Sequence, residues 1–307
     1  MRAVRIHDYA EPPRIDELPA PGPAASGEVS VQVAAVGVGS WDVGVANGRL
    51  AGFVALEPPF VLGAELAGRV TGVGPGVEGF TIGDRIIANP GIVGAWAERV
   101  NLRAATCGPS PASLDDSHAA ALPVGGVTAL QALDLLALTP GASLLILGAG
   151  GSVGRAAIQL AGVRDLSVHA LVPAWEVAGS RQLGAQSALD QADDWIAQLP
   201  GSVDGVLDLV GGEALERSIA ALRDDTRVVT TLSESMRTPV AASVSMHYLR
   251  MRATTADLAV VSAHVDAGEL TMPVGVVLPV EDAPAAFADM QAFLDRGKHV
   301  LEFQLAS

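Results

Sequence analysis

The chain has 307 residues, half of them hydrophobic and 17% charged, so it can bury a large core and is not globally disordered. Acidic residues outnumber basic ones 34 to 19, and the formal net charge of -15 disfavours binding to nucleic acid or to an anionic membrane surface. A single cysteine, Cys107, excludes an internal disulfide, and no signal-like or membrane-spanning apolar run is seen, so we expect a cytoplasmic protein.

Short strands broken by glycine-rich turns fill the chain up to about residue 120. The predicted strands are Val29–Val38, Ala67–Val73, Gly83–Ala88 and Ala95–Leu102. Many short strands of this kind favour a partly closed barrel or a sandwich.

Apolar segments of strand length alternate with segments of helical spacing after Leu122. The predicted order is helix Gly125–Leu138, strand Leu144–Gly148, helix Ser152–Ala161, strand Leu166–Val172, helix Trp175–Leu183, a short acidic helix within Ala188–Leu199, strand Val203–Gly211, helix Glu213–Leu222 and strand Arg227–Leu232. Fully apolar strands separated by helices predict a doubly wound parallel sheet covered on both faces, and hence an α/β protein.

The last part of the chain departs from this alternation. It reads as strand Ser243–Met251, helix Thr254–Ala267, the strand MPVGVVLPV, helix Asp282–Leu294 and the strand HVLEF. The last two strands lie beyond the doubly wound pattern, so we expect them to return and complete the first domain.

The segment LLILGAGGSVGRAAIQLA carries the strongest local signal for binding. It follows a predicted strand, opens a helix, and contains Ala149-x-Gly151-x-x-Gly154, a variant of the dinucleotide fingerprint. Gly148 permits a sharp exit from the strand, Gly151 lets a pyrophosphate approach the backbone, and Gly154 lets the helix pack on the strand. The backbone N–H groups predicted to face the phosphates are those of Gly151, Ser152 and Val153.

The end of the second strand, where an NAD site carries Asp or Glu for the ribose, reads LVPAW and holds no carboxylate. Leu171 and Val172 are expected to line the cofactor there, and Glu176 is the nearest acid. Arg181 and Arg155 could reach a 2′-phosphate, or they could be plain surface charges. The missing carboxylate favours NADPH and leaves NADH open.

Several segments together resemble the medium-chain dehydrogenase/reductase superfamily. They are PFVLGAELAGRVTGVGPGVEGFTIGDRI, AWAERV, AALPVGGVTALQAL, LILGAGGSVGRAAIQLA, VDGVLDLVGG and RGKHVLEF. In this order they are most similar to its zinc-free quinone oxidoreductase (zeta-crystallin-like) and enoyl reductase branch, over nearly the whole chain.

The resemblance implies a GroES-like β-rich catalytic domain at residues 1–122 and 268–307 and a Rossmann dinucleotide-binding domain at residues 123–267. It places Thr128 near the nicotinamide end of the cofactor. The residues implied to line the dinucleotide crevice at the ends of sheet strands are Leu209, Val210, Gly211, Thr230, Thr231 and Leu232, and the switch-point rule for parallel sheets places ligands at the same edge.

A zinc-dependent member needs a Cys, a His and a third ligand, and this chain has Gly39-Ser40 and Ala64 at the first two positions. Glu65 remains beside the lost histidine, and we expect it to pair within its turn. The six histidines are dispersed, so no zinc is expected. Without a metal the favoured reaction is conjugate hydride transfer to an enone, an enoyl thioester or a quinone, with hydrogen-bond donors at the developing oxyanion.

The segment GVGSWDVGVANG departs from the quinone oxidoreductases, which carry Asn and often Tyr where this chain has Gly39 and Gly44. Ser40, Trp41 and Tyr248 are therefore the candidate catalytic residues, with Trp41 offering an indole N–H or acting as a core aromatic. Asn89 and His247 are further candidates, whereas structural roles are expected for Asp42 and for Asp84-Arg85.

Three functions remain in competition. The first is a zinc-independent NAD(P)H-dependent oxidoreductase acting on a small-molecule quinone or α,β-unsaturated carbonyl compound. The second is a nucleotide-binding sensor or scaffold with little or no turnover, and the third, binding of nucleic acid, conflicts with the acidic charge. A bare edge at Ser243–Met251 also predicts a homodimer.

Overall fold

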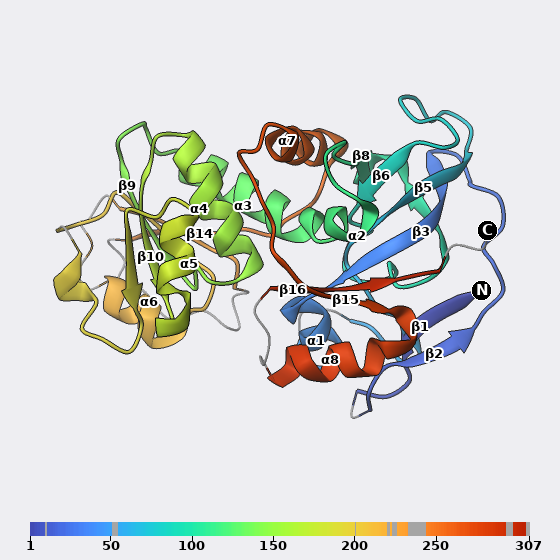
Figure 1. The fold of residues 1–307 in the computed structure, drawn as a ribbon, viewed down its shortest axis with the longest axis horizontal. Coiled ribbons are helices and arrows are strands. Elements are labelled where there is room, and N and C mark those ends of the chain that lie inside the picture. Colours follow the sequence, from blue (N-terminus) through green and yellow to red (C-terminus); the bar gives the residue numbers. More distant parts are fainter. Residues whose placement is uncertain are drawn as a thin grey trace. The chain divides into compact units, whose positions relative to one another are not determined.

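The computed structural model describes residues 1–9, 11–50, 55–199, 201–219, 222, 226–232, 244–292 and 297–304, without the side chains of residues 290–292. The chain divides into two compact units (Figure 1). The first comprises Met1–Val124, Arg252–Gly268 and Met272–Ser307, and the second comprises Gly125–Met251 and Glu269–Thr271. The β-rich first unit and the parallel sheet of the second confirm the predicted fold class.

A seven-stranded sheet forms the framework of the first unit, in the order β15-β16-β3-β5-β6-β8 with β7 paired to β3. Its strands are β3 (Glu28–Val38), β5 (Leu66–Val73), β6 (Arg85–Ala88), β7 (Arg99–Arg103), β8 (Cys107–Pro109), β15 (Val274–Pro279) and β16 (Lys298–Glu302). The C-terminal strands β15 and β16 therefore do return to the first domain. A smaller sheet holds β1 (Arg2–Ile6), β2 (Arg14–Glu17) and β4 (Phe60–Val61).

Helices pack around this sheet (Figure 1). The helix α1 (Ser40–Ala46) packs against α8 (Ala283–Ala292), and α2 (Asp116–Ala119) lies on β3 and β5. The helix α7 (Thr255–Asp266) packs on β8, where Ser262 Oγ donates to the Pro109 carbonyl at 2.6 Å. A Cβ at Gly108 would lie 2.4 Å from Leu258 Cβ, so a glycine is required for this close packing.

The contacts of α7 correct one predicted boundary. The sequence assigned residues up to 267 to the Rossmann domain, whereas Arg252–Gly268 groups with the first unit. The physical reason is that α7 buries Leu258 and Val261 against the β-rich unit and its Asp266 caps the loop N–H groups of Ala112 and Ser113.

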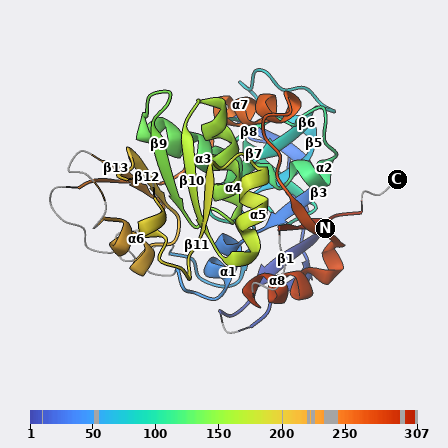
Figure 2. The ribbon, with the colours of Figure 1, turned by 60° about the vertical axis from the view of Figure 1, so that its left-hand side comes forward.

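The second unit is a six-stranded parallel sheet in the order β11-β10-β9-β12-β13-β14. Its strands are β9 (Ser143–Leu147), β10 (Ser167–Val172), β11 (Ser187–Asp190), β12 (Gly205–Asp208), β13 (Arg227–Thr230) and β14 (Ser245–Tyr248). Its helices are α3 (Leu122–Leu136), α4 (Ser152–Val163), α5 (Val177–Gln182) and α6 (Gly212–Ile219). The first turn of α3 belongs to the first unit. The helix α4 packs on β9 and β10, and α5 packs on β10 and β11 (Figure 2).

Two predicted elements of this unit differ from the structure. The stretch Ala188–Leu199 begins with the strand β11, because Ala188 and Leu189 are buried beside β10, and its only helical turn is the 3-10 turn Ile196–Gln198. The helix expected at Trp175–Leu183 starts as a 3-10 turn at Ala174–Glu176. Parts of the predicted segments Glu213–Leu222, Ser243–Met251 and Asp282–Leu294 lie outside the described residues.

Among the helices that the structure describes, none combines the length and the apolar character needed to cross a lipid bilayer.

Candidate dinucleotide site and buried lysine–carboxylate cluster

The glycine turn joins β9 to α4 at the carboxyl edge of the parallel sheet, the edge where its strands end. Gly148 takes a φ of +80°, which favours glycine and turns the chain sharply out of β9. The N–H groups of Gly148 and Ala149 donate to the Leu171 carbonyl at the end of β10, at 3.2 and 3.1 Å. The turn is thereby tied to the neighbouring strand before α4 begins after Gly151.

The glycines of the turn have different physical roles. A Cβ at Gly154 would lie 2.5 Å from Ala149 Cα, so this glycine allows α4 to pack on the turn. A Cβ at Gly151 would meet no described atom closer than the Gly148 carbonyl oxygen at 3.8 Å, so this glycine leaves open space beside the start of α4. The Gly151 N–H, predicted to face the phosphates, donates instead to the Gly148 carbonyl at 3.3 Å. Open space beside the N–H groups of the first turn of α4 fits an anionic diphosphate.

Asp208 organises the rest of the carboxyl edge, a role that the sequence analysis did not assign to it. It is fully buried at the end of β12, and its carboxylate accepts the Val210 and Gly211 N–H groups at 3.2 and 2.7 Å and the Thr230 hydroxyl at 2.8 Å. The Leu232 N–H in turn donates to Thr230 Oγ1 at 3.1 Å. A buried acid ending an apolar strand was the available signal for this role.

The structure thus brings together most of the residues predicted to line the dinucleotide crevice. A Cβ at Gly148 would lie 2.5 Å from Val210 Cγ1, so the loop after β12 covers the glycine turn. Tyr248 ends β14 in register with Thr230, at the same edge of the sheet. Thr128 is buried within α3, and Arg181 is exposed in the last turn of α5.

Arg155 and Glu176 form a buried ion pair beside the glycine turn. Arg155 Nη2 lies 2.6 Å from Glu176 Oε1, and Arg155 Nε donates to the Gly150 carbonyl at 2.8 Å. The two side chains are only 13% and 5% exposed. A Cβ at Gly150 would lie 3.1 Å from Glu176 Cγ, so this glycine makes room for the acid.

This pair corrects the sequence interpretation of the ribose position. The 3-10 turn after β10 carries Glu176 back to the glycine turn, so a carboxylate does lie at this edge even though the strand end itself has none. Arg155 is neither a free surface charge nor an unpaired partner for a 2′-phosphate. The argument for NADPH from a missing carboxylate therefore does not hold in that form.

In the first unit, a second group of polar residues lies near Gly39 and Ala64, the positions where zinc-dependent dehydrogenases carry metal ligands. Ser40 is exposed at the start of α1, and the Trp41 indole N–H donates to the Ile92 carbonyl at 3.1 Å. Asn89 Nδ2 donates to the carbonyl of Ala64 at 2.6 Å. The indole N–H of Trp41 and the side-chain amide of Asn89 are therefore both hydrogen-bonded to backbone carbonyl groups of the first unit.

Glu65 pairs across the sheet and not within its own turn as expected. Its carboxylate forms an ion pair with Lys298 on β16, and the two side chains are 1% and 4% exposed. Its other oxygen accepts the Val124 N–H at 2.8 Å, at the start of α3. A Cβ at Gly39 would lie 3.6 Å from Lys298 Nζ, so the ammonium ends beside the position where a zinc enzyme would have its cysteine.

Asp42 completes this lysine–carboxylate cluster of Asp42, Glu65 and Lys298. Its Oδ2 accepts the Gly39 N–H at 2.9 Å, while Oδ1 is buried with no hydrogen-bond partner among the described residues. Burial and the nearby Glu65 carboxylate raise the pKa of Asp42 to about 7. Below that pH Asp42 is mostly a neutral acid beside the Glu65–Lys298 ion pair.

The described residues contain no group of three or more His, Cys, Asp and Glu side chains that could hold a metal ion. Cys107 is buried, and its burial raises the pKa of the thiol to about 12. The residue types at Gly39 and Ala64 therefore do not fit the zinc site of the metal-dependent dehydrogenases.

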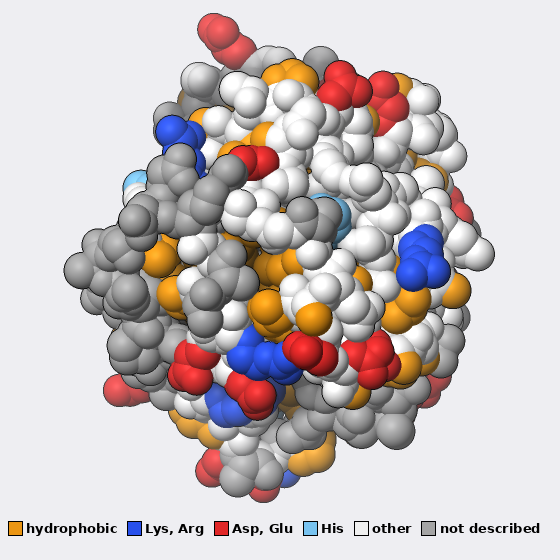
Figure 3. Space-filling view, turned by 90° about the vertical axis from the view of Figure 1, so that its left-hand side faces the viewer, with side chains coloured by type: hydrophobic (Ala, Val, Ile, Leu, Met, Phe, Trp, Pro, Cys, Tyr) orange, Lys and Arg blue, Asp and Glu red, His pale blue; other side chains and the backbone are white. Residues whose placement is uncertain are grey.

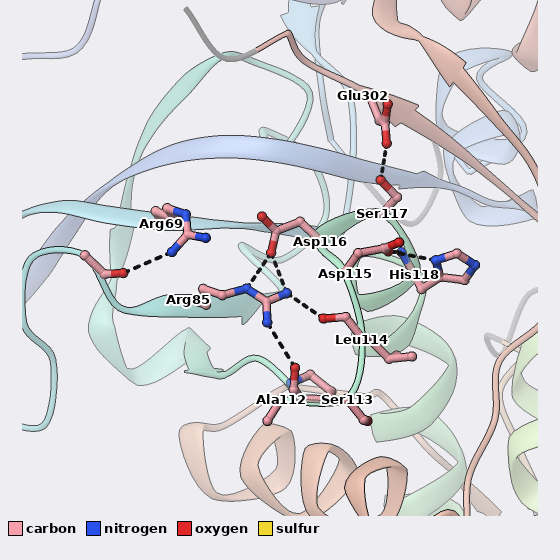
Figure 4. Close-up of polar contacts among 12 residues, drawn as sticks. Arg69, Arg85, Ala112, Ser113, Leu114, Asp115, Asp116, Ser117, His118 and Glu302 are labelled. Atoms are coloured by element: carbon pink, nitrogen blue, oxygen red, sulfur yellow. Dashed lines mark hydrogen bonds and ion pairs between the residues drawn. The ribbon is translucent and has the colours of Figure 1, made fainter. Parts of the chain in front are cut away.

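Arg85 has the structural role expected for it (Figure 4). Its guanidinium binds Asp116 Oδ1 through Nε and Nη2 at 2.8 and 2.7 Å and also donates to the carbonyls of Pro111 and Leu114. It thus anchors the loop that leads from β8 into α2. Asp84 accepts the Thr81 N–H at 2.7 Å and so closes a local turn.

Comparison with known proteins gives two family matches and several relatives. Residues 25–114 match the alcohol dehydrogenase GroES-like domain, and residues 183–301 match the zinc-binding dehydrogenase model. The chain is 34% identical over 300 residues to the spectinabilin polyketide synthase system protein NorB of Streptomyces orinoci, an alignment that covers 92% of this chain and 13% of that protein. The chain spans only 4% of another matching synthase, GfsB of Streptomyces halstedii.

Solved structures also resemble the chain over nearly its whole length, and two of them serve as examples. An NAD-dependent alcohol dehydrogenase is 29% identical with a TM-score of 0.86, and the alignment covers 99% of this chain and 100% of that one. A mycobacterial quinone oxidoreductase is 26% identical with a TM-score of 0.83, at 99% and 100% coverage.

Proposed function

The chain belongs to the medium-chain dehydrogenase/reductase superfamily of oxidoreductases, and we propose that within it the chain is a zinc-independent reductase that uses NADPH or NADH. Its proposed substrates are quinones or the activated C=C bonds of enones and enoyl thioesters. The observation that carries the proposal is the glycine turn, where Gly151 leaves open space beside the helix N–H groups while Gly154 packs against Ala149.

The proposed division of labour begins with cofactor binding. The N–H groups at the start of α4 and the positive end of its dipole bind the diphosphate, and the loops held by Asp208 shape the adjoining edge. The bound nicotinamide would supply the hydride. Thr128, Leu171, Val172 and the residues of the loops after β12 and β13 are proposed to position it.

Zinc independence is supported by what fills the place of the metal ligands. Gly39 and Ala64 offer no metal-binding atoms in their side chains, and the ammonium of Lys298, which Glu65 holds in place, ends beside Gly39. A reaction without a Lewis acid needs only hydrogen-bond donors at the developing oxyanion, each worth about 3–4 kcal/mol if the scale of acyl-transfer oxyanion holes applies. Ser40, Trp41 and Tyr248 remain the proposed catalytic residues, Ser40 and Tyr248 for their hydroxyl groups and Trp41 as an aromatic lining of the substrate position.

The relatives support both proposed substrate classes. The relatives include a quinone oxidoreductase and polyketide synthases, and we infer that an enoyl thioester is the substrate class that links this chain to the synthases. The match to a small part of each synthase makes an enoyl thioester on a carrier the more specific proposal for that class.

The alternative is a nucleotide-binding module with little or no turnover. It is favoured by one observation in α1, where the quinone oxidoreductases usually carry a tyrosine and this chain has Gly44. A Cβ at Gly44 would lie 3.2 Å from Leu50 Cδ1, so Leu50 occupies the space that a larger side chain would need.

One experiment distinguishes the two candidates. The purified chain is tested for oxidation of NADPH and NADH by a panel of quinones, enones and enoyl thioesters, with stereospecifically deuterated cofactor to follow hydride transfer. Deuterium in a reduced product supports the reductase. Cofactor binding in calorimetry without any transfer across the panel supports the module and removes the enzyme proposal.

We also propose that the chain forms a homodimer and binds small molecules in preference to nucleic acid. The strand β14 is the outer strand of the described parallel sheet, and a bare edge can pair with a second copy. On the face drawn in Figure 3, basic and acidic side chains are interspersed, without a continuous basic surface there. Sedimentation showing only monomers would contradict the dimer, and salt-sensitive binding of duplex DNA would contradict the preference.

A further inference from the structure

The Arg155–Glu176 ion pair lies beside the glycine turn, and Glu176 follows the end of β10 by four residues. The strand β10 ends at Val172 beside β9, and the 3-10 turn Ala174–Glu176 follows it directly. In such folds an acid near this point binds the ribose 2′-hydroxyl of NAD, whereas an arginine nearby accommodates the 2′-phosphate of NADP. This chain has both residue types at that point, and they are bound to each other.

The pair is held in a fixed position by its surroundings. Arg155 Nε is bound to the Gly150 carbonyl at 2.8 Å while Nη2 holds Glu176 at 2.6 Å. Glu176 packs against Gly150, and its backbone N–H donates to the Pro173 carbonyl at 2.9 Å. Both residues belong to the same compact unit, so the pair does not depend on the other unit.

Charge cancellation decides what the pair does to a cofactor. A free carboxylate would repel a 2′-phosphate and accept a 2′-hydroxyl, and a free guanidinium would bind the phosphate with charge-assisted hydrogen bonds. Bound to each other at this distance, the two groups present almost no net charge. The pair itself therefore gives neither cofactor a strong electrostatic advantage.

We propose that the Arg155–Glu176 pair makes the dinucleotide site accept NADH and NADPH with similar affinity, and that each partner suppresses the selectivity of the other. This inference rests on the proposed function, because it concerns the same cofactor site. It names Arg155 and Glu176 as the residues that determine cofactor specificity in this chain.

The test measures dissociation constants of NADPH and NADH by calorimetry, and of adenosine 2′,5′-diphosphate and ADP as fragments without the nicotinamide. The wild-type chain is expected to bind the two cofactors within about tenfold of each other. Glu176→Gln frees the guanidinium and is expected to shift the ratio towards NADPH by about tenfold or more. Arg155→Gln frees the carboxylate and is expected to shift the ratio by a similar factor towards NADH.

A matched control removes a carboxylate from another arginine of the same unit. Asp134 pairs with Arg164 at 2.7 Å, at the far end of α4, about 18 Å along the helix from the glycine turn. Asp134→Asn changes the net charge as Glu176→Gln does, and it is expected to leave the cofactor ratio unchanged. Thermal unfolding and circular dichroism confirm that each variant is folded before its affinities are compared.

The outcomes separate the inference from the proposed function. If the wild-type chain binds neither cofactor, the proposed function fails and the inference fails with it. If it binds them but prefers one by more than about a hundredfold, or if folded Glu176→Gln and Arg155→Gln both keep the wild-type ratio, the inference alone is wrong. Opposite shifts in the two variants, in the fragments as well as in the full cofactors, support it.

Discussion

Replacing Asp42 by asparagine should change how the stability of the chain depends on pH. The pKa of Asp42 is raised from 3.8 to about 7, first by burial and then by the Glu65 carboxylate. The stability that the protonated acid carries is complete below pH 3.8, the ordinary value, and is lost as the pH rises towards 7. The asparagine side chain of the Asp42→Asn variant cannot ionise, so the variant lacks this loss.

The magnitude follows from the size of the pKa shift. One pKa unit corresponds to about 1.4 kcal/mol, so the whole shift is worth about 4 kcal/mol and the part between pH 5 and pH 8 about 3 kcal/mol. The asparagine of the variant can still accept the Gly39 N–H through its side-chain carbonyl oxygen, so the capping contact at 2.9 Å has a substitute. The Asp42→Asn change therefore removes the ionisable group and keeps nearly the same side-chain shape.

The assay is chemical unfolding of both proteins at a series of pH values from 5 to 8, read as free energies of unfolding. Between these limits the wild-type chain should lose about 3 kcal/mol more than the Asp42→Asn variant. All other ionisable groups are shared by the two proteins, so most of their contribution cancels in the difference. Parallel curves, separated by the same amount at every pH, would refute the account of a buried acid with a raised pKa.

Three further predictions concern the same two sites. Gly151→Ala should keep the stability of the wild-type chain and weaken NADPH and NADH binding by about tenfold or more. Gly154→Ala should lower the free energy of unfolding by about 1–3 kcal/mol, because its Cβ would lie 2.5 Å from Ala149 Cα. Equal effects of the two changes on stability would contradict this assignment of roles. Lys298→Met should destabilise the chain by about 3–5 kcal/mol, because it leaves the Glu65 carboxylate buried without its partner. The double variant Lys298→Met with Glu65→Gln should recover part of that loss. A Lys298→Met variant with unchanged stability would contradict the proposed role of the pair. Cys107 should resist thiol reagents at pH 8 until the chain unfolds, because its pKa is raised to about 12, and rapid labelling of the native protein would show that this thiol is accessible.

The sequence predicted those parts of the fold that depend on local pattern. The buried runs of β9 and β10 and the Gly148–Gly154 turn have the residues that a covered parallel sheet and a close helix packing require, and the structure confirms these elements. The strand β11 was missed because its four residues, Ser187–Asp190, are too short to distinguish from the acidic segment that follows them. Local sequence pattern also could not show that α7 packs on β8, since this contact joins segments about 150 residues apart.

The candidate site was predictable where one segment supplies it and unpredictable where distant residues meet. The dinucleotide fingerprint predicted the glycine turn. The partners of Arg155, Glu65 and Asp208 lie in other segments of the chain and could not be predicted from local pattern. The position of Glu176 is one that the local sequence pattern did not predict. It follows β10 by only a few residues, yet its position beside Gly150 depends on the 3-10 turn that brings it back.

The central claim is hydride transfer from a nicotinamide cofactor without a metal ion, and its most direct test measures both in one sample. The chain is purified in the presence of a chelator, its metal content is determined by mass spectrometry, and turnover of deuterated NADPH and NADH with the quinone and enone panel is followed before and after zinc is added. The account predicts deuterium transfer by protein with far less than one zinc per chain, and no gain when zinc is supplied. Activity that appears only with stoichiometric zinc would contradict it.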